Sequence, residues 1–354
     1  MAIFVNFDTD LLMMVNLKQT IKGWMLPIAM LAGASIYLIY HFLPEPIHYA
    51  GPFLGELLGV VQPLLIFSML FLTFCTIEPK DLKLHRWHWW LLLVQGGVFV
   101  FLGLLAVLIL KAFPGRSDSL VVLIESAMLC FICPTATAAS VVTRKLGGDV
   151  PGITTYIVLI NILTALLVPI VIPLILPEST LGFWVSFKMI VAKVFPLLIT
   201  PCLCAWFVRY LVPKLHKKLI SYPDLAFYLW SVALTLAIGV TAKSIVQSSM
   251  SVWLILGMSL VSLFSCVFQF YIGRRIGNNY TPRHRFTSLK DEEKGREVRK
   301  ITSGQSLGQK NTVFAIWLGY TFMTPETAIV GGLYSIWHNV YNSWQLRMAS
   351  KKQS

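Results

Sequence analysis

The sequence predicts an all-α membrane protein with ten membrane-spanning helices. Hydrophobic residues make up 56% of the 354 residues and charged residues only 13%, whereas soluble domains average about 25% charged residues. The apolar residues also fall into blocks of about 20, the length that crosses about 30 Å of hydrocarbon as a helix. Because a bilayer offers no water to backbone polar groups, these blocks are expected to be helical.

The apolar blocks define ten segments along the chain. Their approximate bounds are 23–43, 53–76, 89–112, 120–146, 151–176, 182–212, 224–248, 252–275, 298–323 and 325–347. Residues 1–22 mix apolar and polar side chains, which is typical of an interfacial helix. The charged stretch 276–297 is expected to be a flexible cytoplasmic connector.

The basic residues indicate which side of the membrane each loop lies on. Placing both chain ends in the cytoplasm assigns 23 of the 29 Lys and Arg residues to cytoplasmic regions. Only Lys111, Arg116 and Lys243 then lie in outer regions. This asymmetry follows the positive-inside rule and favours a multi-pass protein of a cell inner membrane.

The composition does not indicate a nucleic acid partner, a metal or another cofactor. The net charge of +13 suits loops beside anionic lipid head groups. Nucleic acid is not an expected partner, because the aromatic residues lie mostly in the apolar blocks. The six cysteines also lie in apolar blocks without the ligand spacing of a zinc site, so neither a metal nor another cofactor is expected.

Two of the segments are interrupted by polar and small residues. The fourth segment is broken at 133–137 and the ninth at 303–312. Ten helices divide into two repeats of five, 23–176 and 182–347, and an odd repeat length inverts the second repeat relative to the first. Paired interrupted helices at matching places in two repeats are the best sequence indication of a transport site near the bilayer midplane.

Polar side chains inside the spans are the candidates for chemistry, because they are costly in a bilayer and usually face a cavity. They are Gln95, Glu125, the stretch 135–140, Asn161, the stretch 303–312, His338 and Asn339. Simpler roles remain open for several of them. Gln95 and Glu125 could serve only as hydrogen-bond partners of neighbouring helices. His338 could be an imidazole packed in the core, and Lys310 could extend to the membrane–water interface.

Four motifs in order resemble the bile acid:sodium symporter family. They are LLLVQ ending at Gln95, CPTATAAS at 133–140 followed by GGDV at 147–150, GQKNT at 308–312, and SIWHN at 335–339. The resemblance implies a core domain of helices 3–5 and 8–10, with helices 4 and 9 broken and crossing. It also implies a panel domain of helices 1, 2, 6 and 7, and sodium-driven transport of bile acids and other organic anions.

The sequence departs from that family at its sodium sites. By this alignment Ser306 stands where the family has a Glu that serves both sodium sites, and Lys310 stands where it has a sodium-binding Gln. Ala139 and Ser140 replace a Ser-Asn pair, and Asn161 matches a Thr ligand. A site built from carbonyls and a carboxylate has therefore lost the carboxylate and gained a cation.

These observations lead to the hypothesis of a secondary active transporter of a small organic anion that works by alternating access without sodium. The Lys310 ammonium would take the place of a sodium ion at a helix C-terminus. The expected ion-coupling residues are Lys310, Gln95, Ser306, Gln309, Ser140, Asn161 and Glu125. The expected substrate-binding residues are Asn311, Thr312, His338, Asn339, Thr135 and Thr137.

Several alternatives remain open at this stage. If Lys310 keeps its proton, the protein is an uncoupled or exchange-type carrier; if it loses the proton during the cycle, transport is coupled to protons. A sodium-coupled organic anion symporter is the nearest alternative, followed by a membrane sensor or channel on the same scaffold. An enzyme is not expected, since the chain has no Asp-rich or His-Glu-x-x-His motif.

Overall fold

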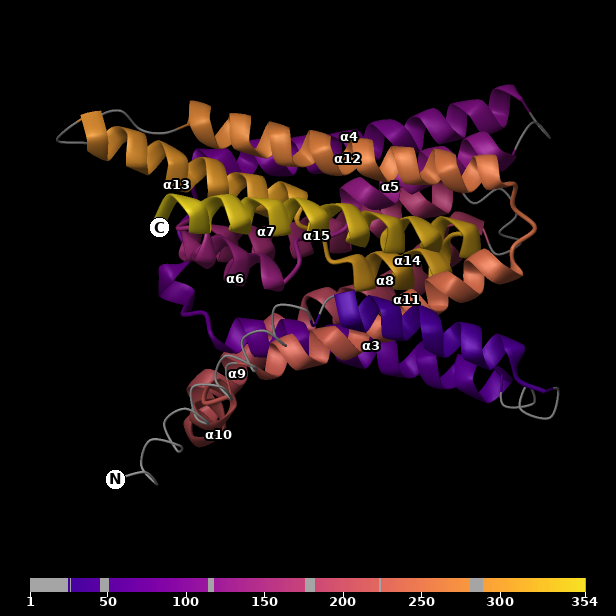
Figure 1. Cartoon of the computed structure of the whole chain (residues 1–354), viewed down its shortest axis with the longest axis horizontal. Helices are drawn as coiled ribbons and strands as arrows, with labels where there is room; N and C mark the ends of the chain where they lie inside the picture. The colour runs from indigo at the N-terminus through magenta and orange to yellow at the C-terminus, as the bar shows by residue number, and fades with distance from the viewer. Residues whose placement is uncertain are drawn as a thin grey trace, which may run out of the picture.

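A computed structural model of the chain describes residues 25, 27–44, 51–113, 118–175, 182–222, 224–280 and 289–353. Within these residues the protein is built from helices, joined by short turns (Figure 1). The expected interfacial segment 1–22 lies outside the described residues.

The helices follow the expected segments closely. An unlabelled helix, Pro27–Phe42, comes first. The labelled elements are α3 (Gly51–Cys75), η1 (Pro79–Asp81), α4 (Arg86–Ala112), α5 (Asp118–Ile132), α6 (Ala138–Lys145), α7 (Val150–Ile175), α8 (Gly182–Leu198), α9 (Thr200–Leu211), α10 (Pro213–Ile220), α11 (Leu225–Gln247), α12 (Val252–Asn279), α13 (Leu289–Gly308), α14 (Thr312–Phe322) and α15 (Pro325–Gln353).

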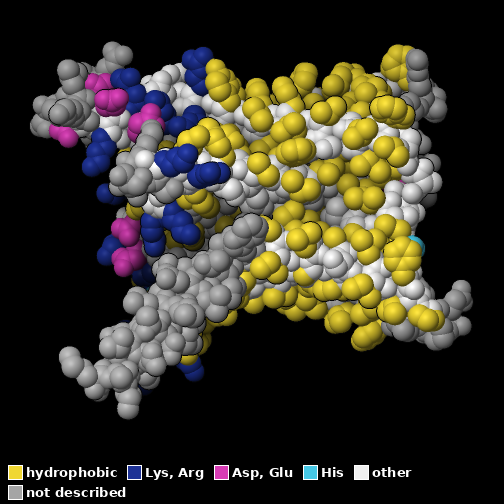
Figure 2. Space-filling model, viewed as in Figure 1, with side chains coloured by type: hydrophobic (Ala, Val, Ile, Leu, Met, Phe, Trp, Pro, Cys, Tyr) yellow, Lys and Arg dark blue, Asp and Glu magenta, His cyan; other side chains and the backbone are white. Residues whose placement is uncertain are grey.

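Six stretches in the described part are long and apolar enough to cross a membrane, with α8 and α9 together forming one of them. Their apolar side chains are largely exposed: Phe264 is 70% exposed and Leu108 64%. Figure 2 shows hydrophobic side chains spread over most of one face, while Lys and Arg gather at one end. We call this the basic end; α6, α10 and the C-terminus lie there in Figure 1. An apolar band next to a basic end is the surface expected of a protein solvated by lipid.

The two interruptions expected from the sequence are present, but the second is shorter than expected. Between α5 and α6 the break covers 133–137, as expected. Between α13 and α14 it covers only 309–311, so residues 303–308 are helical. The polar groups there are tied into the packed structure: Ser303 Oγ donates to the Arg299 carbonyl at 2.6 Å, and Gln305 Nε2 donates to side chains of α15. Tertiary contacts therefore outweigh the low helix propensity of this stretch.

The cytoplasmic connector expected at 276–297 is also shorter. α12 continues to Asn279 and α13 already begins at Leu289, while residues 281–288 lie outside the described part. Ion pairs along the helix stabilise this polar beginning of α13, since Arg296 bonds Glu292 at 2.9 Å and Lys300 bonds Glu297 at 2.6 Å. Pairs of opposite charge three or four residues apart stabilise a helix, and here they stabilise a stretch with too few apolar residues to be held by packing alone.

α12 and α13 form one of the closest helix pairs of the molecule, and two glycines of α12 permit it. A Cβ on Gly273 would lie 2.6 Å from the Ser303 carbonyl oxygen. A Cβ on Gly277 would collide with the Arg299 backbone and the Ser303 side chain. Small residues at helix contacts are typical of packing in membranes, where backbones approach closely.

We expect Gly273→Ala to destabilise the protein by about 1–3 kcal/mol, because the added methyl overpacks a helix contact whose nearest atoms belong to the backbone. Gly97→Ala is the matched control, since nothing lies within 4 Å of a Cβ built on this glycine of α4. Thermal unfolding in detergent should show a lower midpoint for Gly273→Ala than for Gly97→Ala. Equal midpoints would contradict the close approach of α12 and α13.

The packing separates the helices into neighbourhoods that position the site. α3 packs against α9 and α11, α4 packs against α5 and α7, and α12 packs against α13 and α15. The largest hydrophobic cluster joins these neighbourhoods and includes Met128, Phe314 and Tyr334, each at most 2% exposed. The cluster includes Cys133 of the first break and Val313, which follows the second break.

Candidate functional site

The two broken helices meet at their breaks. Thr135 and Lys310 form an isolated antiparallel β-bridge. The Ala136 N–H donates to the Gln309 carbonyl at 2.9 Å, and the Asn311 N–H donates to the Pro134 carbonyl at 2.8 Å. We call this meeting point of residues 133–137 and 309–311 the crossing. Its hydrogen bonds satisfy backbone groups that the helix ends leave without partners. It places two helix C-termini, those of α5 and α13, close together.

The C-terminus of α5 is capped by side chains from several elements. Each of four successive carbonyls, which no N–H of the helix reaches, accepts a hydrogen bond from a different side chain. Gln269 Nε2 donates to Cys130 at 3.2 Å, Lys310 Nζ to Phe131 at 3.3 Å, Thr164 Oγ1 to Ile132 at 2.9 Å, and Gln95 Nε2 to Cys133 at 2.9 Å. These donors come from α12, the second break, α7 and α4, so four parts of the fold converge on one helix end.

Lys310 is the only one of the four donors of this cap whose side chain can carry a charge. The side chain is 1% exposed, and no carboxylate in the described part of the chain lies within ion-pair distance of it. A helix C-terminus carries about half a negative charge. A positive charge on Lys310 would therefore be stabilised by the α5 carbonyls rather than by an acid.

The C-terminus of α13 is capped in a similar way. Thr135 Oγ1 donates to the Ser306 carbonyl at 2.5 Å, and Tyr334 OH donates to the Gly308 carbonyl at 2.8 Å. Ser306 Oγ and Gln309 Oε1 are buried and have no hydrogen-bond partner among the described residues. Two acceptor groups beside the crossing are thus available to a ligand or to water.

Two glutamine–tyrosine pairs flank the crossing. Tyr156 OH of α7 donates to Gln95 Oε1 of α4 at 2.9 Å, and Gln269 Nε2 of α12 donates to Tyr334 OH of α15 at 3.2 Å. In each pair a glutamine on the helix before a broken helix contacts a tyrosine on the helix after it. Each pair also bonds a carbonyl at a break.

The remaining expected ion-coupling residues lie at varied distances from this cap. Asn161 of α7 is 1% exposed, and its Nδ2 donates to the Ile157 carbonyl of its own helix at 2.7 Å. Ser140 Oγ donates to the Thr137 carbonyl at 2.9 Å within the first turn of α6. Glu125 Oε2 accepts from Thr327 Oγ1 of α15 at 2.9 Å. The structure therefore does not join Ser140 or Glu125 to the carbonyls at the end of α5.

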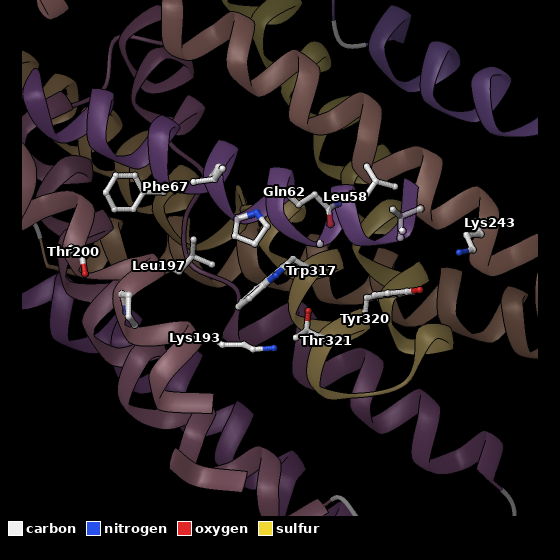
Figure 3. A pocket seen from close by; sticks show the side chains of 16 residues that line it. Leu58, Gln62, Phe67, Lys193, Leu197, Thr200, Lys243, Trp317, Tyr320 and Thr321 are labelled. Atoms are coloured by element: carbon white, nitrogen blue, oxygen red, sulfur yellow. The ribbon is translucent and has the colours of Figure 1, made fainter. Parts of the chain in front are cut away.

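A cavity of about 530 Å³ lies between α3, α8, α9, α11 and α14 (Figure 3). Its lining is mainly apolar, and its polar members are Gln62, Lys193, Thr200, Lys243, Trp317, Tyr320 and Thr321. Lys193 reaches from α8 toward α14, with Nζ 5.6 Å from the centre of the Phe322 ring. Gln62 Nε2 is buried without a hydrogen-bond partner in the described part.

None of the expected substrate-binding residues lines this cavity. Asn311 instead begins α14, where its Oδ1 accepts from the Phe314 N–H at 3.2 Å. His338 is 2% exposed with its ring edge-on to Tyr334 at 5.7 Å between centroids. Asn339 Nδ2 donates to the Ser335 carbonyl of its own helix. Thr135 holds the crossing together, Thr312 is buried, and Thr137 is half-buried.

A profile of the Sodium Bile acid symporter family matches residues 63–249. The chain belongs to this family. Members of the family are membrane transporters, so the chain is a multi-pass membrane transporter and not an enzyme. A comparison with curated proteins gives no match.

The matched range covers Gln95, the first break and Asn161, whereas the second break and His338 lie beyond it. The departures at Ser306 and Lys310 thus fall in the part of the chain that the family profile does not match. Their relation to the family's sodium ligands rests on the order of the sequence motifs and on the meeting of the two breaks.

Sequence reasoning missed several polar residues of this symporter-family chain. Gln269, Thr164 and Tyr156 take part in the caps and pairs around the crossing, and Gln62 and Lys243 line the cavity. Gln62 and Gln269 each stand alone in an apolar run, which is the signal that singled out Gln95. Thr164 and Tyr156 gave no such signal, since both residue types are common in apolar helices.

Proposed function

We propose that this chain is a secondary active transporter of a small organic anion that needs no sodium, because the Lys310 ammonium takes the place of a sodium ion. The observation that carries the proposal is the hydrogen bond from Lys310 Nζ to the Phe131 carbonyl, in a cap otherwise made of neutral donors. The ammonium supplies one positive charge and three donors. It can therefore stabilise the carbonyl end of α5 without a bound ion.

The arrangement of the helices supports an alternating-access mechanism. In the proposed ten-helix topology, α5 with α6 and α13 with α14 are the broken helices 4 and 9 of two inverted repeats. The two glutamine–tyrosine pairs then occupy equivalent places, on helices 3 and 5 and on helices 8 and 10. Transporters with inverted repeats move one bundle against another around a site at discontinuous helices.

The cavity supports an organic anion as the substrate. It lies where the proposed panel, consisting of Pro27–Phe42, α3, α8, α9 and α11, faces α14 of the proposed core. Apolar walls with a few convergent polar groups are typical of small-molecule sites. Lys193 and Lys243 supply positive charge, and Gln62 supplies an unpaired donor. The best fit is an anion with an apolar body. We assign the basic end to the cytoplasm and propose that the anion enters from the opposite side.

The sodium requirement provides the direct test. We expect purified protein in liposomes to take up taurocholate at the same initial rate in sodium, potassium and choline buffers, because Lys310 already carries the charge that sodium would bring. Protein-free liposomes in the three buffers serve as the control for leakage. A saturable sodium requirement would favour the sodium-coupled symporter instead and end the proposal.

Lys193→Met should weaken taurocholate binding by about tenfold, the lower end of what a hydrogen bond to a charged group contributes. Lys188→Met is the matched control, since Lys188 is an exposed lysine of the same helix that does not line the cavity. Calorimetric titration of both variants measures the difference. The same dissociation constant in Lys193→Met and Lys188→Met would show that the cavity is not the anion site.

A further inference from the structure

A stripe of buried polar side chains runs along α15 from the crossing to the basic end. Tyr334, His338, Asn342 and Gln345 follow one another at intervals of about one helical turn, which places them on one face of the helix. All four are at most 9% exposed. We call these four residues the α15 stripe.

The stripe begins next to Gln269, a member of the cap that also contains Lys310. Tyr334 OH donates to the Gly308 carbonyl and receives a hydrogen bond from Gln269 Nε2. Gln269 in turn donates to the Cys130 carbonyl, which neighbours the Phe131 carbonyl that holds Lys310. Tyr334, at the inner end of the stripe, is thus one hydrogen bond from Gln269 of the cap and two from the Cys130 carbonyl.

The stripe continues between α13 and α15. Gln305 Nε2 of α13 donates to both Asn342 Oδ1 at 2.9 Å and Gln345 Oε1 at 2.8 Å. Gln345 is one of the last buried residues of α15 before the exposed C-terminal turns at the basic end. Buried polar side chains therefore extend from the crossing to the end of the molecule where solvent begins.

Unpaired buried polar atoms are concentrated in the stripe, at the end of α13 and in the break that follows it. Within the described part of the chain, Gln305 Oε1, Ser306 Oγ, Gln309 Oε1, His338 Nδ1 and Asn342 Nδ2 have no hydrogen-bond partner. Leaving a buried polar group unpaired costs about 1–3 kcal/mol. Buried water commonly pairs such groups, and each water bonds about three of them. An interface that offers both donors and acceptors suits a string of waters.

We propose that the interface of α13 and α15 holds a string of water molecules through which Lys310 exchanges its proton with the basic end. In the outward step, the ammonium gives a proton to the nearest water, each water passes one on, and the last releases one to solvent. Lys310 is left as a neutral amine, and the reverse steps restore the ammonium. The inference rests on the proposed role of Lys310 and favours proton coupling over uncoupled exchange.

The surroundings of Lys310 leave it as the group that carries this proton. The titratable side chains facing it are the thiols of Cys130 and Cys133 on α5 and of Cys266 on α12. Tyr334 on α15 lies next to the same thiols. No carboxylate among the described residues takes part, and Glu125 is bonded to Thr327 elsewhere on α5 and α15.

Radiolytic labelling by X-rays tests the string without any transport measurement, because hydroxyl radicals form from water held beside a side chain. In the full chain in nanodiscs, we expect Tyr334 and His338 to be labelled although both are 2% exposed. Tyr156 is the matched control, a tyrosine that is 0% exposed and bonded to Gln95. Labelling of Tyr334 and His338 no faster than that of Tyr156 would overturn the proposal.

The double variant Gln305→Leu with Asn342→Leu should lose the labelling of His338, since it removes the polar groups that hold water between the two helices. Exposed Tyr271 should be labelled as before. Undiminished labelling of His338 would show that water arrives by another way and would overturn the route. If the double variant does not fold, Asn342→Leu alone is used with the same criterion.

The proton step is tested with an imposed pH gradient. Taurocholate uptake by the wild type should change with the gradient, whereas uptake by the double variant should not. Equal responses of the two proteins would overturn the proton route even where the labelling results agree with it. A sodium requirement in the wild type, in contrast, would contradict the proposed function and leave the labelling result unaffected.

Discussion

Lys310→Met should reduce taurocholate uptake to that of protein-free liposomes while the protein still folds. Methionine has nearly the length of lysine, so the space at the crossing stays filled. The Phe131 carbonyl, however, loses its donor, and the end of α5 loses the positive charge that stabilises it. If alternating access needs that charge in place of sodium, the crossing is not stabilised in the variant. The helices then cannot make the movement that transport requires.

The control and the readouts separate transport from folding. Lys188→Met removes an exposed lysine of α8 and should retain full uptake. Thermal unfolding of Lys310→Met should change little, because the cost of an unpaired carbonyl, about 1–3 kcal/mol, is offset by removal of a buried charge. Wild-type uptake by a folded Lys310→Met protein would refute the role proposed for the ammonium.

The sequence alone predicted the helical membrane class and the location of the breaks. These features depend on local composition: apolar blocks of membrane length, and a run such as 133–137 that lacks helix formers. For Lys310 the sequence predicted a donor to the carbonyls of a helix C-terminus, and its role in place of a sodium ion stays a prediction. The structure names Phe131 as the acceptor, while Gln95 caps the neighbouring carbonyl of Cys133 and does not bond Lys310.

The errors arose where contacts between distant segments decide the structure. The sequence predicted an interruption at residues 303–308. These residues are helical because Gln305 of α13 bonds Asn342 and Gln345 of α15. The cavity was not foreseen, because its lining comes from five helices and sequence periodicity does not show which of them face one another. A single sequence identifies polar residues inside spans but not the groups they pair with.

A sodium requirement should appear when the Glu and Gln that the motif resemblance implies for the sodium sites are placed at positions 306 and 310. The double variant Ser306→Glu with Lys310→Gln removes the cation at the crossing and adds a carboxylate at a position that is buried, with Ser306 Oγ unpaired in the described part. The freed Phe131 carbonyl, the new carboxylate and the glutamine amide would offer oxygen ligands to a sodium ion. The end of α5 would still carry its partial negative charge.

We therefore expect taurocholate uptake by the double variant to be saturable in sodium and absent in choline, the reverse of the wild type. Sodium should also raise its unfolding temperature, since a ligand at 100 times its dissociation constant stabilises the folded state by about 2.7 kcal/mol. Ser306→Glu alone is the control: its carboxylate should pair with Lys310, leaving neither uptake nor unfolding sensitive to sodium. If sodium shifts neither property in the double variant, then Lys310 does not occupy the place of the ion, and the cap at the end of α5 is only a structural contact.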